Sequence, residues 1–180
     1  AEMQVWQVIG PPWQAIVIPG PSWQTTAMSQ LTFANMYQLG YITRDLDRAA
    51  ARFCRIFGIG RFRIIRHGPD IATAHAYVGN TMIELIETSP NGPAYFQPYI
   101  PDDPDTAVFH HHAYRVHEEA EFDRLIAAAG ELGLDHEVSS VKDGDMNVMF
   151  VDLRQVTGAY AEYVYLKGSM LSYYDDVPRN

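Results

Sequence analysis

Two stretches of this 180-residue chain resemble each other distantly, and each begins and ends on a side chain able to bind a metal ion. The first runs from Gln38 to Glu84, and the second runs from His111 to Glu162. In both, a strand-like segment leads directly into an amphipathic helix. An internal duplication of this kind would bring four oxygen or nitrogen donors together from opposite halves of one domain. The chain can therefore form a metal site although it has no compact metal-binding motif.

The first repeat, residues 33–87, predicts the order β-α-β-β-β. A strand is expected over residues 37–43, because successive side chains there can alternate between two faces. Asp45 is placed to cap a helix that ends near Phe57, where two glycines follow. Three further strands are expected over residues 61–66, 72–78 and 81–87. Gly79-Asn80 forms a tight turn between the last two of these strands.

The second repeat, residues 108–167, predicts the same order. A strand over residues 109–116 leads into an amphipathic helix over residues 119–132. Three strands then follow, over residues 136–141, 147–152 and 159–166. Between the repeats, residues 88–107 hold five prolines and an acidic run, which is typical of a linker. The expected fold class is therefore α+β, with two paired βαβββ modules.

Two end segments differ from the repeats. Residues 1–32 contain Trp-Gln three times, interleaved with prolines that forbid a long helix. Three tryptophans carry too much apolar surface to leave in water, so this Pro/Trp-rich N-terminal arm is expected to pack on the body or on a second subunit. The tail, residues 168–180, has no pattern that predicts its position.

Strand alternation tests whether the four donors face one cleft. When all four do, the opposite strand faces are apolar enough for a core, and only His112 does not fit. The residues that share the cleft side are then Gly40, Ile42, Met82, Ile86, Ala113, Arg115, Tyr160 and Val164. The residues expected to pack under the first helix are Tyr37, Leu39 and Tyr41. Three other histidines are expected to be surface or hydrogen-bonded structural residues, namely His75, His117 and His136.

Burial gives Glu84 and Glu162 a reason to belong to such a site. Both lie in strongly apolar strands, where an ionised carboxylate is unfavourable unless it is paired or bound to a metal. A lone glutamate in such a strand is more often a rim residue or one partner of an ion pair, but here two of them lie at matching ends of the repeats. Among three consecutive histidines, alternation allows either His111 alone, or His110 with His112, to face the site.

With these fragments in order, the chain resembles the glyoxalase/bleomycin-resistance proteins of the vicinal oxygen chelate superfamily over about residues 33–167. Gln-Leu-Gly-Tyr-Ile-Thr-Arg-Asp-Leu-Asp opens the first repeat and Ile-Glu-Leu closes it; His-His-Ala-Tyr-Arg-Val opens the second and Gly-Ala-Tyr-Ala-Glu closes it. The resemblance implies that the paired modules curl into a cupped mixed sheet around a divalent metal. It implies Gln38, Glu84, His111 and Glu162 as the ligands, a set similar to that of glyoxalase I enzymes.

This ligand set suits Zn, Ni, Co, Mn or Fe(II) and leaves positions for water or substrate. The metal would polarise a substrate carbonyl while Glu162 or Glu84 removes the neighbouring proton. The expected substrate contacts are Arg115, Tyr160 and Met82, whose surroundings favour a small apolar or aromatic molecule. The expected function is a metal-dependent lyase, isomerase or epimerase of the glyoxalase-like type.

Two other functions compete with this one. A metal-free small-molecule binding protein resembles the antibiotic-sequestering members of the family, which commonly lose the ligand residues. An Fe(II) extradiol-type dioxygenase would use two histidines and one glutamate, so Gln38 and Glu84 argue against it. Glyoxalase I activity itself is disfavoured, because the sequence has no cluster of Arg and Lys for the carboxylates of glutathione.

Composition narrows the partners and the location. A formal charge of −9 argues against non-specific nucleic-acid binding, because no basic stripe is available to neutralise phosphates. No segment approaches the roughly 20 apolar residues of a membrane span, and no signal peptide is recognisable. A single cysteine, Cys54, rules out an internal disulfide and fits a reducing compartment. We therefore expect a cytoplasmic homodimer with a small-molecule substrate and neither a nucleic-acid nor a membrane partner.

Overall fold

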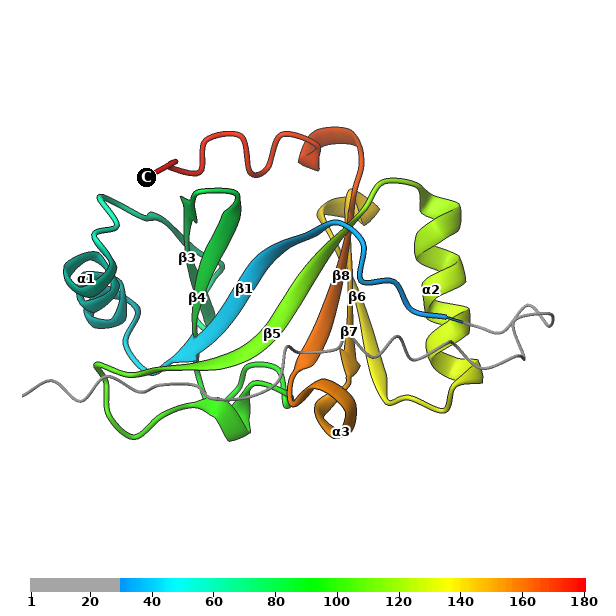
Figure 1. Ribbon diagram of the computed structural model, residues 1–180, viewed down its shortest axis with the longest axis horizontal. Coiled ribbons are helices and arrows are strands. Elements are labelled where there is room, and N and C mark those ends of the chain that lie inside the picture. Colours follow the sequence, from blue (N-terminus) through cyan, green and yellow to red (C-terminus); the bar gives the residue numbers. More distant parts are fainter. Residues whose placement is uncertain (1–29) are drawn as a thin grey trace, which may run out of the picture.

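The computed structural model describes residues 30–180, so the arm predicted over residues 1–32 lies almost wholly outside the part described. The strands of the first half are β1 (Met36–Thr43), β2 (Arg63–Arg66), β3 (Ile71–Val78) and β4 (Thr81–Thr88). Those of the second half are β5 (Ala107–Val116), β6 (His136–Val141), β7 (Met146–Asp152) and β8 (Tyr160–Leu166). They form one sheet with the order β2-β3-β4-β1-β5-β8-β7-β6 (Figure 1).

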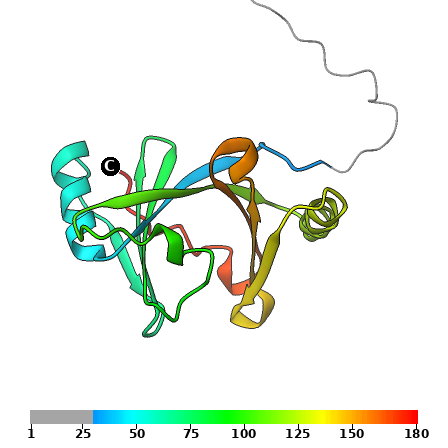
Figure 2. The same ribbon diagram turned by 90° about the horizontal axis from the view of Figure 1, so that it is seen from below.

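The sheet consists of two similar halves. β1 pairs parallel with β4 in the first half, and β5 pairs parallel with β8 in the second. The halves meet at the centre of the sheet, where β1 and β5 run antiparallel. This arrangement confirms the predicted α+β class, because two paired βαβββ units form one mixed sheet that curls into a half-barrel (Figure 2).

One long helix covers the outer face of each half. α1 (Leu46–Phe57) and α2 (Glu119–Glu131) lie at opposite ends of the molecule, outside the curled sheet (Figures 1 and 2). Leu85 of β4 belongs to the core under α1, and Tyr163 of β8 belongs to the core under α2. The shorter helical turns are α3 (Arg154–Thr157), η1 (Gln97–Tyr99), η2 (Lys142–Gly144) and η3 (Gly168–Met170). Among residues 30–180, no helix has the length and apolar character needed to cross a membrane.

Local chemistry sets the two ends of α1. Asp45 has an extended backbone, and its side chain accepts a hydrogen bond from the Arg48 backbone N–H at 3.0 Å. This is the geometry of an N-cap, which satisfies a donor that the first turn leaves free. Gly58 ends the helix in the left-handed region at a φ of 69°, where a residue without Cβ is favoured.

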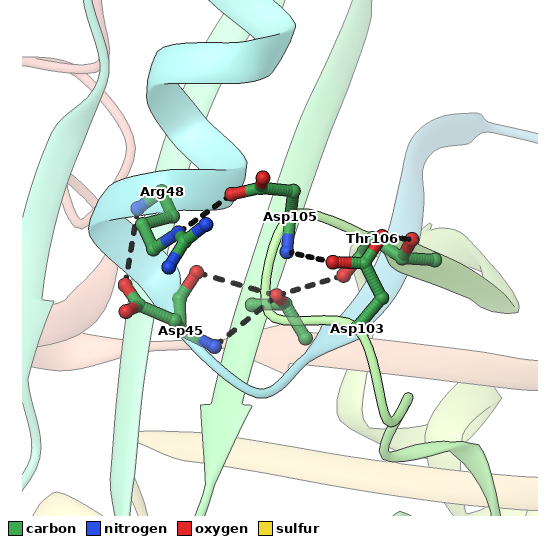
Figure 3. Close-up of polar contacts among 6 residues, drawn as sticks. Asp45, Arg48, Asp103, Asp105 and Thr106 are labelled. Atoms are coloured by element: carbon green, nitrogen blue, oxygen red, sulfur yellow. Dashed lines mark hydrogen bonds and ion pairs between the residues drawn. The ribbon is translucent and has the colours of Figure 1, made fainter.

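The start of α1 is also tied to the segment that leads into β5 (Figure 3). The Arg48 guanidinium donates to the Asp105 carboxylate at 2.6 Å. The Asp103 carboxylate accepts from the Asp105 backbone N–H and from the Thr106 hydroxyl. The Thr43 hydroxyl, at the end of β1, donates to the Thr106 carbonyl oxygen at 3.0 Å. These contacts fix the end of β1 against the start of β5, the two central strands.

The linker and the tail cross opposite ends of the half-barrel (Figure 1). The tail leaves β8 and runs over the sheet to the edge of the first half, where the chain ends near α1 and β3. There the Tyr77 backbone N–H donates to the Pro178 carbonyl at 2.8 Å, and the Asn180 side chain accepts from the Gly60 backbone N–H at 2.9 Å. The tail, whose position the sequence does not predict, therefore links the two halves.

A β-bulge near the start of β1 breaks the predicted alternation. The register of β1 against β5 shifts between Met36 and Gln38. An extra residue in one strand reverses the direction of the side chains on one side of it. Tyr37 consequently packs with Val164 on the inner face, whereas Tyr41 packs under α1 as expected. The prediction that Tyr37 lies under the first helix is therefore wrong.

Candidate metal centre

The four donors predicted from the sequence lie together on the inner face of the sheet. In the β1–β4 pair, Gln38 lies two register positions before Glu84, and the same offset separates His111 from Glu162 in the β5–β8 pair. The two halves therefore present equivalent side chains from equivalent strands. The antiparallel β1–β5 pair at the centre then brings the two sets to one place.

The distances within this group are short. The Gln38 Nε2 donates to Glu84 Oε2 at 2.5 Å. The His111 Nε2 lies 3.4 Å from an oxygen of Glu84 and 3.4 Å from an oxygen of Glu162. All four residues are more than nine-tenths buried. Ligand atoms of Glu84, His111 and Glu162 all lie within 4.8 Å of one another, so these three residues form a group able to hold a metal ion.

A glycine makes room for the histidine of this group. Gly40 lies directly opposite His111 in the β1–β5 pair. A Cβ at position 40 would fall 1.9 Å from the His111 Cε1, much closer than any real contact allows. The imidazole ring therefore lies over the bare backbone of β1, and a larger residue would displace it.

Two neighbouring histidines of β5 face the inner side of the sheet. His110 and His111 are both fully buried, and their Nδ1 atoms are 3.0 Å apart. The register of β5 against β1 skips His110, which makes it the extra residue of a bulge. Of the three histidines, His111 belongs to the metal-binding group, which is one of the two predicted alternatives. Strict alternation would send His110 to the other face, but the bulge turns it to the inner face beside His111.

His75 is a second residue that the sequence analysis did not assign to the site. It lies directly opposite Glu84 in the β3–β4 pair and is buried, and its Nε2 is 2.9 Å from Glu84 Oε1. A signal for it exists in the sequence. The turn at Gly79-Asn80 places Val78 opposite Thr81, and counting back along both strands places His75 opposite Glu84.

The two carboxylates have different electrostatic environments. Burial alone would raise the pKa of Glu84, but the nearby His111 and His75 imidazoles lower it to about 2. Burial raises the pKa of Glu162, and the charge of His111 offsets only part of that shift. For His111, burial acts against the charged form, yet attraction to the two carboxylates raises its pKa to about 9. The cluster therefore favours a positive charge between the carboxylates.

Unpaired polar atoms in the cluster fit a metal ion. Gln38 Oε1, His111 Nε2 and Glu162 Oε2 are buried and have no hydrogen-bond partner among the residues that the structure describes. Buried polar atoms without a partner are rare in native proteins, because each one costs about 1–3 kcal/mol. One imidazole nitrogen with carboxylate and amide oxygens is a mixed donor set of the kind that divalent metals accept. The residues present therefore fit such an ion.

A cavity of about 430 Å³ opens above the carboxylates. Glu84, Glu162 and His75 line its polar floor. Its walls are mainly aromatic and aliphatic, and they include Ile71, Ile86, Tyr95, Phe96, Met146, Val148, Phe150, Met170, Tyr173 and Tyr174. Tyr95 and Phe96 come from the linker, and Tyr173 and Tyr174 come from the tail. The linker and the tail therefore complete a site that the two modules begin.

The three predicted substrate contacts lie outside the lining of this cavity. Met82 is fully buried beside Gln38. The Arg115 guanidinium lies 4.9 Å from the centre of the Tyr37 ring, between that ring and the tail. Tyr160 stacks on His110 and lines a neighbouring cavity of about 390 Å³ instead. Strand alternation gives the face on which a side chain lies, but it does not give the depth at which the linker and tail close the cavity.

Solved structures share this fold. Methylmalonyl-CoA epimerase from Mycobacterium tuberculosis has a TM-score of 0.55 and 14% identity, over 79% of this chain and 97% of that one. A variant of methylmalonyl-CoA epimerase from Streptomyces coelicolor, in complex with 2-nitronate-propionyl-CoA, has a TM-score of 0.53 and 15% identity, over 76% and 100%. A hypothetical protein from Bacillus halodurans has a TM-score of 0.53 and 18% identity, over 75% and 96%.

The sequence itself places the chain in a family. No curated protein matches it. Residues 37–155, more than half of the 180 residues, match the sequence profile of the Glyoxalase/Bleomycin resistance protein/Dioxygenase superfamily. This match agrees with the predicted resemblance to the vicinal oxygen chelate proteins and with the paired βαβββ halves of the structure. The chain therefore belongs to the Glyoxalase/Bleomycin resistance protein/Dioxygenase superfamily.

Proposed function

We propose that this protein is a divalent-metal-dependent isomerase, epimerase or lyase that removes a proton next to a carbonyl group of a small substrate. One observation carries the proposal. Gln38, Glu84, His111 and Glu162 lie together, the two glutamates line an apolar cavity, and three of the buried polar atoms of the group have no hydrogen-bond partner among the described residues. The methylmalonyl-CoA epimerases support the reaction class to the extent that the same fold carries such a reaction in them.

The same four residues are the proposed metal ligands. The unpaired Gln38 Oε1 and His111 Nε2 would bind the ion together with the carboxylates of Glu84 and Glu162. Zn, Ni, Co, Mn and Fe(II) all accept such a mixed set. When bound, the ion would polarise the substrate carbonyl and stabilise the negative charge left as the neighbouring proton departs.

Glu162 is the carboxylate better suited to accept the proton. Glu84 is held by Gln38 on one side and by His75 on the other. Glu162 has one oxygen without a hydrogen-bond partner, lines the cavity and has a raised pKa because it is buried. A raised pKa strengthens a carboxylate as a proton acceptor, and a free oxygen can turn toward the substrate. Glu84 then serves mainly to hold the ion.

The walls of the cavity favour a small apolar or aromatic substrate. Rings from the linker, the tail and β7 surround the floor, and Lys142 is the one lysine or arginine among its lining residues. Ligand sites of this size are typically apolar with a few polar groups that fix orientation. A substrate with one anionic group at the rim beside Lys142 fits this lining better than a polyanion.

The competing functions stay open to test. A metal-free binding protein would use the same cavity without the ion, and the unpaired donor atoms of the cluster argue against that use. An extradiol-type dioxygenase would leave Glu84 without a role, although Glu84 lies within ligand distance of His111. The homodimer and the cytoplasmic location stay predictions.

The test measures metal and proton exchange together. Purified protein is dialysed, and its metal content is measured by mass spectrometry. The protein is then incubated in D2O with a panel of small carbonyl compounds, and loss of the α-proton signal is followed by NMR with Glu162→Gln as the control. We expect about one divalent ion per chain and exchange that the variant loses. A protein without bound metal, together with a variant that exchanges as fast as the parent, would sink the proposal.

A further inference from the structure

His110 lies between the candidate ligand His111 and the linker, in a continuous chain of short contacts. Its Nδ1 is 3.0 Å from the Nδ1 of His111. Its Nε2 is 3.2 Å from the backbone carbonyl oxygen of Tyr95. Both nitrogens of His110 therefore have a partner, and neither points to the carboxylates.

The contact between His110 and the Tyr95 carbonyl determines which imidazole nitrogens carry protons. A backbone carbonyl only accepts hydrogen bonds, so the Nε2 of His110 must carry the proton that it donates to Tyr95. In a neutral imidazole the other nitrogen is then a bare acceptor. The Nδ1 of His110 must accordingly accept from His111, which places the proton of His111 on its own Nδ1.

If His110 instead donated its Nδ1 proton to His111, His110 would have to be positively charged. In that case His110 would donate from both nitrogens, and His111 would accept through Nδ1. His110 is fully buried among aromatic rings, and it stacks on Tyr160 with a centroid distance of 4.6 Å. A positive charge without an acidic partner is unfavourable in such surroundings. The neutral order is therefore the one that the structure supports.

This order has a consequence at the other side of the His111 ring. With one proton fixed on Nδ1, only the Nε2 of His111 is left to hold a second proton or a metal ion, and that atom lies 3.4 Å from oxygens of Glu84 and Glu162. The two carboxylates favour a positive charge at this point, which a proton on Nε2 or a metal ion in its place can supply. The Nε2 is also one of the buried atoms without a hydrogen-bond partner. When Nε2 gives up its proton, the ring is therefore left in the one neutral tautomer that can bind a metal ion at this point.

We propose that His110 is a positioning residue, which holds His111 as its Nδ1–H tautomer and so directs the Nε2 lone pair into the carboxylate cluster. The inference rests on the proposed metal-dependent function, and it adds a residue that touches neither the ion nor the substrate. Partners of this kind fix the orientation of ligating histidines and raise their basicity. The bulge in β5 is what makes the contact available, because in a regular strand His110 would point to the other face.

Packing alone is the competing explanation, and two variants separate it from positioning. His110→Phe keeps a ring of similar size against Tyr160 but has no acceptor for His111. His110→Asn keeps an acceptor at a position close to that of Nδ1 but loses the ring. If His110 acts as an acceptor, we expect the Phe variant to lose about 10- to 100-fold in metal affinity. The Asn variant should bind the metal more tightly than the Phe variant, although it is the less stable of the two.

The experiment uses the full chain and two readouts. Metal affinity is measured by competition with a chromophoric chelator, using Zn²⁺, and His117→Asn, which alters an exposed histidine, serves as the control. Independently, long-range proton–nitrogen NMR on metal-free protein labelled with ¹⁵N-histidine reads the tautomer of His110, and loss of its signals in His110→Asn gives the assignment. We expect an Nε2–H tautomer at neutral pH.

The outcomes of the two readouts are distinct. An Nδ1–H or a charged His110 in the NMR spectrum overturns the inference, and so does wild-type metal affinity in His110→Phe. If the wild-type protein binds no Zn²⁺, the proposed function is overturned instead. The tautomer measurement still decides which nitrogen of His110 carries the proton. If His110→Phe fails to fold, the NMR measurement on the parent protein settles the same point.

Discussion

Glu84 and Glu162 occupy equivalent positions in the two halves of the sheet, yet their neighbours on the next strand differ. His75 lies opposite Glu84 on β3, whereas Phe150 lies opposite Glu162 on β7. Glu84 therefore has a polar partner on that side, and Glu162 has an aromatic ring. In the proposed function, this difference on the neighbouring strand lets Glu84 hold the metal ion while Glu162 is free to accept a proton.

A second pair of equivalent positions shows the same division. Gly40 and Ala113 each lie two residues after a candidate ligand, and each lies opposite the ligand of the other half. The residue opposite His111 is a glycine, because the imidazole ring occupies the space of a Cβ. The residue opposite Gln38 is an alanine, because a slender amide leaves room for a methyl group. At both pairs of positions, the two halves therefore differ next to ligands that differ from each other.

The largest expected effect comes from removing one charge from either carboxylate. Glu162→Gln should reduce proton exchange by about 10²- to 10⁴-fold, which is the range for loss of a general base. Glu84→Gln should mainly weaken metal binding, so that its exchange rate recovers in part when metal is in excess. The measurement is exchange rate against metal concentration for both variants. Equal losses that excess metal does not change in either variant would show that the two carboxylates share one role.

The next effect comes from changing the neighbour of each carboxylate. His75→Phe makes the surroundings of Glu84 like those of Glu162, so we expect metal affinity to fall by about 10- to 100-fold. Phe150→His is the matched variant, because it offers Glu162 a new hydrogen-bond donor. It should slow proton exchange by holding Glu162 in place, with little loss of metal affinity. If His75→Phe binds the metal as tightly as the parent does, the difference between His75 and Phe150 does not affect metal binding.

The fold was largely predictable because its signals are local. The side chain of Asp45 caps α1, and the turn at Gly79-Asn80 sets the register of β3 and β4. Both effects depend on neighbours within a few residues, so they can be read from the sequence. The convergence of four donors could be anticipated for a related reason, since a repeated strand order places equivalent residues on equivalent faces.

The unpredicted features depend on contacts between distant segments. The bulges that turn Tyr37 and His110 inward arise from the pairing of β1 with β5, whose paired residues are all more than 60 positions apart, and no local pattern marks them. The closing of the cavity by Tyr95 from the linker and Tyr174 from the tail is equally non-local. Alternation within each strand therefore predicted a cleft face for Arg115, Tyr160 and Met82, but it could not show that other segments cover them.

A methyl group at position 40 tests the divergence of the central strands. Gly40→Ala should lower the free energy of unfolding by about 1–3 kcal/mol, as overpacking of a close-packed interior does, and it should displace the His111 ring. Ala113→Gly is the matched control at the equivalent position. It removes a methyl group and adds chain entropy, so we expect a loss of about 1 kcal/mol without a change in metal affinity. Urea denaturation and chelator competition measure the two effects. Unchanged metal affinity in Gly40→Ala would contradict the placement of the ring.

The smallest effect concerns the tail, which is packed against the half that holds Glu84. Tyr174 lies beside His75, with ring centres 5.7 Å apart, and its hydroxyl receives a 3.5 Å contact from the Tyr37 hydroxyl. Because 3.5 Å is at the outer limit of a hydrogen bond, Tyr174→Phe should change the free energy of unfolding by less than about 1 kcal/mol. The ring itself stays, so metal affinity should match that of the parent. A larger loss in urea denaturation, or weaker metal binding, would show that the hydroxyl pair supports the Glu84 side of the site, and the contrast between the halves would then extend to the tail.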